Sequence, residues 1–149
     1  MINKKNWIRL IGVLLITIIS AVLLVRFKII DIDKIKAQEN DFHYNAISSS
    51  AVIGGFLFTG ISILISAIDK ERINRLWKNN YLDNLHRAAF VGMAANVVTI
   101  LSAYVVICCN VSDKLLKYLI CIEVLTLIIG IVFFSWCIKQ LIFILSKMK

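Results

Sequence analysis

Few residues of this 149-residue chain combine a reactive side chain with a setting suited to chemistry. Glu123 is the only acidic residue well inside an apolar run, and it follows Lys117 by six residues. By helical rise it lies roughly 10 Å beyond that flanking charge. Ionisable groups at such depth in a membrane are costly and often mark a functional site. Two alternatives stay open: the carboxyl reaches back to the surface, or it hydrogen-bonds to hydroxyls such as Ser102 or the serines at 48–50.

The sequence lacks the motifs of the common enzyme classes. It contains no HExxH, no phosphate-binding glycine loop and no Ser/His/Asp set at a workable depth. The glycine-rich stretch at 54–60 lies inside an apolar run and lacks the strand–turn–helix setting of a nucleotide site. His43 and His86 lie at the edges of apolar runs without partners at metal-ligand spacing. We therefore predict that the protein is not an enzyme and needs no cofactor or metal.

The four cysteines also fail to form a recognisable site. None belongs to a CxxC pair, and all lie in or beside apolar segments. We predict that they act as small apolar residues rather than as zinc ligands. They are Cys108, Cys109, Cys121 and Cys137.

The elements that must position these residues are four long apolar runs, at about 7–25, 46–68, 88–109 and 115–138. Hydrophobic residues make up 60% of the chain, and proline is absent. A run of about 20 apolar residues crosses the hydrocarbon core as a helix, and only helices or closed barrels satisfy the backbone there. The sequence therefore predicts an all-α, polytopic membrane protein with one transmembrane domain over residues 1–149.

Basic residues predict the orientation of these helices. With four spans, eleven Lys and Arg fall on the side of both termini and six on the other side. The side richer in Lys and Arg faces the cytoplasm. Both termini are thus predicted to be cytoplasmic, in a bacterial inner membrane.

Small residues recur on the second and third predicted helices at spacings of three and four, which permits close helix approach. Two arrangements stay open: a hairpin of these two helices within one chain, or an additional homo-oligomer through the opposite edge, where Ser50, Gly54 and Gly60 lie. The predicted packing residues are Ala51, Gly55, Thr59, Ser62, Gly92, Asn96 and Thr99.

The segment at 69–87 is basic and amphipathic, so the second helix is predicted to extend to about residue 78. Its basic residues either present a surface to a cytoplasmic partner protein or anionic lipid, or only set the topology. Because basic residues cluster at the ends of apolar runs, we predict contact with membrane lipids and no direct contact with nucleic acid. The residues of this predicted cytoplasmic partner surface are Lys70, Arg72, Arg75 and Lys78.

In length, number of spans, predicted topology and Ile-, Lys- and Asn-rich composition, the chain resembles small four-helix membrane components of bacterial anti-phage defence systems. The membrane subunit of the Kiwa system is the leading candidate, followed by membrane effectors of retron-type systems. The resemblance is architectural and carries over no site residue. It implies a homo-oligomer that works with a soluble, DNA-associated partner during infection. Holins are the nearest rival family.

Three classes of function follow from these observations. We predict an oligomeric inner-membrane component of an antiviral defence system that acts as a sensor or anchor for a cytoplasmic partner. A pore-forming or depolarising effector, or a holin-like protein, is the first alternative. A small-solute carrier is the second, and the absence of proline and of an inverted repeat disfavours it.

Overall fold

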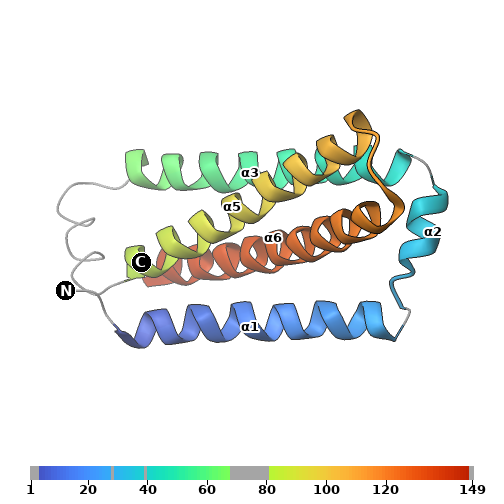
Figure 1. Cartoon of the computed structure of the whole chain (residues 1–149). Coiled ribbons are helices and arrows are strands. Elements are labelled where there is room, and N and C mark those ends of the chain that lie inside the picture. The colour runs from blue at the N-terminus through green and yellow to red at the C-terminus, as the bar shows by residue number, and fades with distance from the viewer. Residues whose placement is uncertain (1–3, 28, 39, 68–80, 148–149) are drawn as a thin grey trace.

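The computed structural model describes residues 4–27, 29–38, 40–67 and 81–147, and within these ranges the chain is helical and has no strand (Figure 1). Four of the helices are long and apolar enough to cross a membrane. The predicted all-α class with four such helices is confirmed. The helices are α1 (Lys4–Arg26), α2 (Ile32–Ala37), α3 (Asp41–Ala67), α5 (Tyr81–Cys108) and α6 (Asp113–Lys147).

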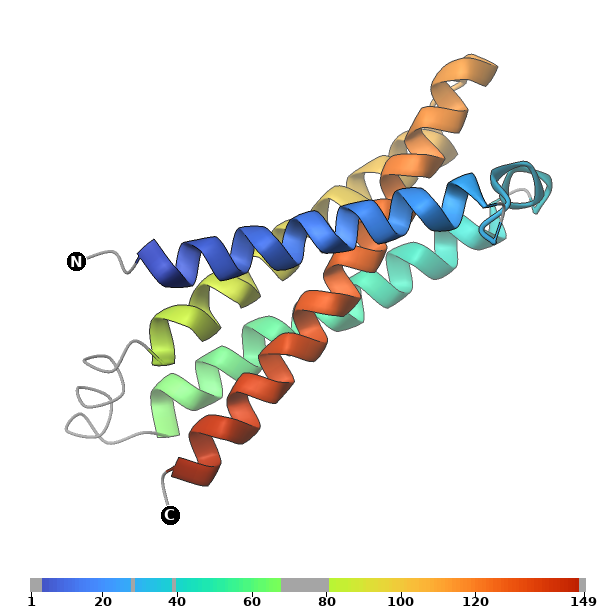
Figure 2. The ribbon, with the colours of Figure 1, turned by 90° about the horizontal axis from the view of Figure 1, so that it is seen from below.

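The centre of the bundle is formed by α5 and α6, which make the most extensive helix pair. Helix α3 packs mainly on α5, whereas α1 contacts mainly α6 through a smaller interface (Figure 1). Figure 2 shows that α6 runs obliquely to α1. Large apolar side chains such as Ile16, Phe56 and Phe90 are more than half exposed. In a membrane these side chains face lipid, where their exposure carries no hydrophobic cost.

The helices extend past the predicted spans, because hydropathy locates the hydrocarbon-spanning part of a helix and not its ends. Helix α3 begins at Asp41 rather than near residue 46, and α5 begins at Tyr81 rather than near 88. Helix α6 continues to Lys147 rather than ending near 138. The predicted extension of the second helix to about 78 lies outside the described residues. The early start of α3 matters for the site, because it places His43 inside a helix.

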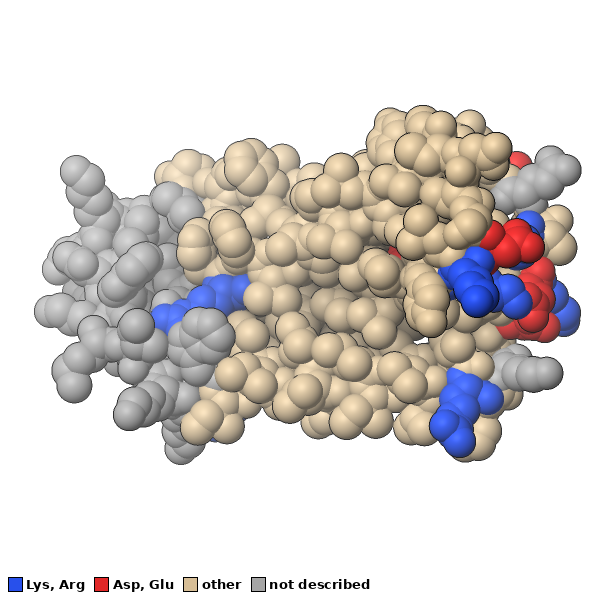
Figure 3. Space-filling view, in the orientation of Figure 1, with Lys and Arg blue, Asp and Glu red and all other residues tan. Residues whose placement is uncertain are grey.

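Helix α2 crosses the end of the bundle opposite to both termini (Figure 1); we call these the α2 end and the terminal end. The side chain of Asp31 caps α2 by accepting from the backbone N–H groups of Asp33 and Lys34. Two exposed ion pairs connect α2 to the first turns of α6. Lys36 pairs with Asp113 at 2.9 Å, and Lys117 pairs with Asp33 at 2.8 Å. Figure 3 shows acidic and basic side chains gathered at the α2 end.

Candidate functional site

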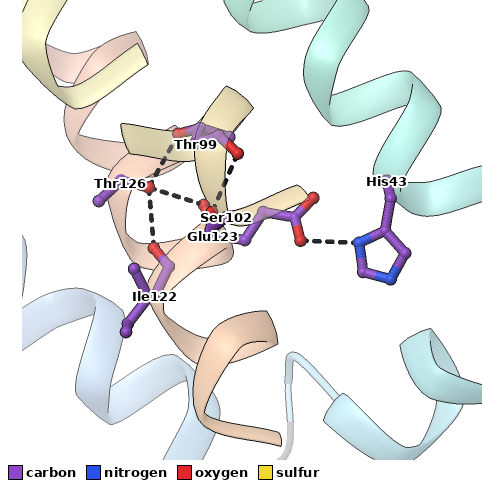
Figure 4. A network of polar contacts seen from close by, with 6 residues as sticks. All are labelled: His43, Thr99, Ser102, Ile122, Glu123 and Thr126. Carbon is purple, nitrogen blue, oxygen red and sulfur yellow. Dashed lines mark hydrogen bonds and ion pairs between the residues drawn. The ribbon is translucent and has the colours of Figure 1, made fainter. Parts of the chain in front are cut away.

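A buried His–Glu pair joins α3 to α6 near the α2 end (Figure 4). Nδ1 of His43 lies 2.7 Å from Oε2 of Glu123. The His43 side chain is 2% exposed and that of Glu123 is fully buried. His43 is the third residue of α3, and Glu123 is the eleventh of α6, so the contact spans two helices that are remote in the sequence.

Two buried oxygen atoms at the site, one in the pair and one beside it, lack a hydrogen bond within the described structure. Oε1 of Glu123 and Oγ of Ser50 are buried and have no partner among the residues that the structure describes. Ser50 follows His43 by two helical turns on the same face of α3. A buried polar atom without a partner costs about 1–3 kcal/mol, and most buried polar groups avoid this cost. The site is therefore poorly optimised for stability, which is typical of groups kept for function.

A cleft of about 250 Å³ opens beside the pair at the α2 end. His43 lines it, and the Nε2 atom of its ring points away from Glu123 (Figure 4). Lys36 and Asn40 add polar groups near the start of α3. The imidazole thus connects the cleft with the buried carboxyl. The other lining residues are Val106, Cys109, Asn110, Val111, Leu116 and Ile120.

Hydroxyl groups continue the polar region from Glu123 toward the middle of the bundle. Oγ1 of Thr126 donates to the carbonyl of Ile122 at 2.8 Å and lies 2.8 Å from Oγ1 of Thr99 on α5 (Figure 4). Oγ of Ser102 donates to the carbonyl of Thr99 at 2.9 Å. The Thr99–Thr126 contact joins α5 to α6 one helical turn from the pair, whereas the other two bonds lie within single helices.

The polar region ends at Asn96. Its Nδ2 donates to the carbonyl of Gly92 at 2.7 Å, and its Oδ1 is buried without a partner in the described part of the chain. A Cβ added at Gly130 would lie 2.8 Å from Nδ2 of Asn96, so a larger residue there would displace the Asn96 side chain. Toward the terminal end the buried side chains become apolar. They include Leu57, Leu85, Ala88, Ala89, Phe133 and Cys137.

Sequence reasoning singled out Glu123 but missed its partner. We expected the carboxyl to meet Ser102 or the serines at 48–50, and we placed His43 at the membrane edge. The structure instead pairs the carboxyl with His43, because α3 begins at Asp41 and turns the imidazole inward. The available signal was the spacing of seven residues between His43 and Ser50, which places two polar groups on one helix face.

The predicted packing residues of the third span lie at helix contacts. Asn96 and Thr99 are buried. A Cβ added at Gly92 would lie 3.0 Å from Cδ1 of Leu57 and 3.2 Å from Cβ of Phe133. Gly92 therefore allows α3 and α6 to approach α5 closely.

Helices α3 and α5 do pack on each other, as the hairpin alternative expected, but the predicted small-residue stripe of the second span faces outward. A Cβ at Gly55 would meet nothing within 4 Å, and the other three members of the stripe are exposed. The face toward α5 carries Ser50, Gly54 and Leu57 instead. Packing of Leu57 against Gly92, together with the His43–Glu123 contact at 2.7 Å, sets this rotation of α3. The exposed residues are Ala51, Gly55, Thr59 and Ser62.

The predicted cytoplasmic partner surface of Lys70, Arg72, Arg75 and Lys78 lies outside the described residues. Within the described ranges, no three His, Cys, Asp or Glu side chains are grouped as metal ligands. No family model, curated protein or solved structure matches the chain. The site must therefore be interpreted from its own geometry.

Proposed function

We propose that this protein is an oligomeric component of the bacterial inner membrane that senses an event at its outer face. The signal passes through the membrane to a cytoplasmic partner, and the setting is an anti-phage defence system. The observation that carries the sensing role is the buried contact of 2.7 Å between His43 and Glu123, beside a cleft at the α2 end. The setting rests on the architectural resemblance to membrane components of such systems.

The chemistry of the pair suits a sensor. When Glu123 is a carboxylate, Nδ1 of His43 carries the proton between them, so Nε2 of a neutral ring is an acceptor. A proton that reaches Nε2 from the cleft converts the neutral ring to an imidazolium, which attracts the carboxylate more strongly. When that proton leaves, the Nδ1–H group still donates to the carboxylate, but the buried anion loses its opposite charge, which is unfavourable. Either change alters the packing of α3 against α6.

The distribution of buried groups favours a sensor over a pore within one chain. Buried polar side chains occupy the half of the bundle near the α2 end, down to Asn96. The terminal half is filled by apolar residues, among which Phe133 is fully buried. A conducting path needs polar groups along the full depth of the membrane. In the described residues of one chain, the buried polar side chains stop midway.

An oligomer fits the outward face of α3. Small residues on an exposed helix face allow a second backbone to approach closely. The hydroxyls of Thr59 and Ser62 bond to carbonyls of their own helix, at 2.7 Å to Gly55 and 2.9 Å to Phe58. Their polar groups are therefore satisfied before another copy packs on this face. A second copy of this chain is the proposed occupant.

The proposal assigns the two ends different tasks. The α2 end faces outward and receives the signal, and the terminal end faces the cytoplasm. The partner binds there to four basic residues, which are Lys70, Arg72, Arg75 and Lys78. The positive-inside distribution of eleven against six basic residues supports this orientation.

The test compares infection with overproduction. In cells that carry the gene among its native neighbours, deletion of the gene should raise the plaquing efficiency of phages. Overproduction of the chain alone should leave the membrane potential unchanged, as read by a voltage-sensitive dye. Depolarisation without infection, abolished by Gly55→Leu on the outward face of α3, would instead support the pore-forming alternative. Unchanged plaquing for every phage tested would remove the defence setting.

A further inference from the structure

A large cleft of the described structure lies at the terminal end, far from the His–Glu pair. It has a volume of about 680 Å³ and lies between α1, α5 and α6. Ligand sites commonly have volumes of about 300–1,000 Å³. Its lining residues are Arg9 and Val13 of α1, Asn84 of α5, and Ser135, Trp136, Lys139, Gln140 and Phe143 of α6.

The cleft is positively charged. Among the side chains that the structure describes, Arg9 and Lys139 line it and no acidic residue does. Asn84 and Gln140 supply amide groups, which donate hydrogen bonds to anionic oxygens. Figure 3 shows basic side chains and no acidic ones among the described atoms at the terminal end in that view. The ligand that complements this lining is an anion.

The depth of the two cations points to a membrane lipid rather than to a soluble anion. Arg9 is the second residue of the span Ile8–Arg26, and Lys139 lies four residues before the end of the span Asp113–Phe143. Both therefore sit near the level of the headgroups, where Trp136 is also favoured. Val13, one helical turn deeper than Arg9, faces the cleft at the level of the acyl chains.

The packing of α1 leaves room for such a ligand. Helix α1 contacts mainly α6, through a small interface. A second cleft between these helices, near the α2 end, has about 310 Å³, and Arg26 is the one charged residue of its described lining. The two clefts thus share the same helix pair but differ in charge. This difference supplies a matched control.

We propose that the terminal-end cleft binds one anionic phospholipid of the surrounding membrane. Its phosphate lies between Arg9 and Lys139, and an acyl chain follows the groove between α1 and α6 past Val13. The lipid fills the space that direct contact between α1 and α6 leaves open. This proposal is independent of the sensing role of the His–Glu pair.

The test measures lipid binding to the full chain by native mass spectrometry. Delipidated protein in detergent is titrated with phosphatidylglycerol, phosphatidylcholine or inorganic phosphate. Wild-type protein should bind phosphatidylglycerol more tightly than phosphatidylcholine, and millimolar phosphate should not displace it. The double variant Arg9→Gln/Lys139→Gln should bind phosphatidylglycerol about 25-fold more weakly, at roughly fivefold per basic residue near a membrane surface.

The control variant Arg26→Gln/Lys114→Gln changes the same residue types on the same two helices at the opposite end. It should bind phosphatidylglycerol as the wild type does. Equal affinity of wild-type protein for the two lipids would overturn the proposal, and this comparison needs no variant. Equal weakening in both double variants would overturn the site, and full displacement by phosphate would identify a soluble anion as the ligand.

Discussion

The free energies of unfolding of variants at His43 and Glu123 show whether the two residues form a buried ion pair or an ordinary interhelical hydrogen bond. Replacing either residue by Leu removes one partner of the contact at 2.7 Å and leaves the other buried. Such a loss costs about 3–5 kcal/mol for a buried ion pair. An interhelical hydrogen bond in a membrane protein contributes only ~0.6 kcal/mol on average. The double variant His43→Leu/Glu123→Leu leaves no orphaned charge, and apolar replacement of a buried pair is often close to neutral.

Two single losses of about 3–5 kcal/mol each, with a double variant near neutral, imply a coupling free energy of about 6–10 kcal/mol between His43 and Glu123 in a double-mutant cycle. The free energy of unfolding can be measured by SDS titration in mixed micelles. Lys36 and Asp113 form the control pair, because their contact has a similar length of 2.9 Å but is exposed. Their coupling should lie between about 0 and 1 kcal/mol. If the single effects at His43 and Glu123 add within ~0.5 kcal/mol, the ionic interpretation is wrong.

Three further predictions concern topology, packing and the cytoplasmic surface. Reporter fusions after Lys149 should be active in the cytoplasm and fusions within 31–41 outside it; an external C-terminus would refute the topology. Gly92→Leu should destabilise the bundle by about 1–3 kcal/mol, because even a Cβ added at Gly92 would lie 3.0 Å from Cδ1 of Leu57 on α3. Gly55→Leu should leave that stability unchanged and reduce the size of the oligomer in detergent; an unchanged size would exclude this face as the interface. Reversal of the four basic charges in the 69–87 segment should abolish recovery of a co-encoded soluble protein in a pull-down. Undiminished recovery with correct insertion would mean that these charges only set the topology.

The four long apolar helices followed from the sequence, because hydropathy is summed over about 20 residues and tolerates local exceptions. Glu123 was identifiable for the same reason: a single carboxyl stands out in an apolar run. His43 was not, since its role depends on where α3 begins. Polar residues such as Asp41 and Asn45 at the membrane surface do not reveal whether the backbone there is already helical.

The rotation of α3 about its own axis also could not be predicted from the sequence. Small residues occupy two of its faces, one with Ser50 and Gly54 and the other with Ala51 and Gly55. Composition alone cannot choose between them. The choice depends on the fit of Leu57 against Gly92 and on the contact of His43 with Glu123, both of which join residues far apart in the chain.

The role of the His–Glu pair in signalling is tested most directly by the plaquing efficiency of phages on cells that carry the His43→Leu/Glu123→Leu variant at the native locus. This variant should insert, assemble and reach the wild-type level in the membrane, because Leu fills both positions without orphaned charge. We expect it to lose protection, so that plaquing rises to the level of the deletion strain. Protection equal to the wild type at the same membrane level would show that the pair only holds α3 against α6 and takes no part in sensing.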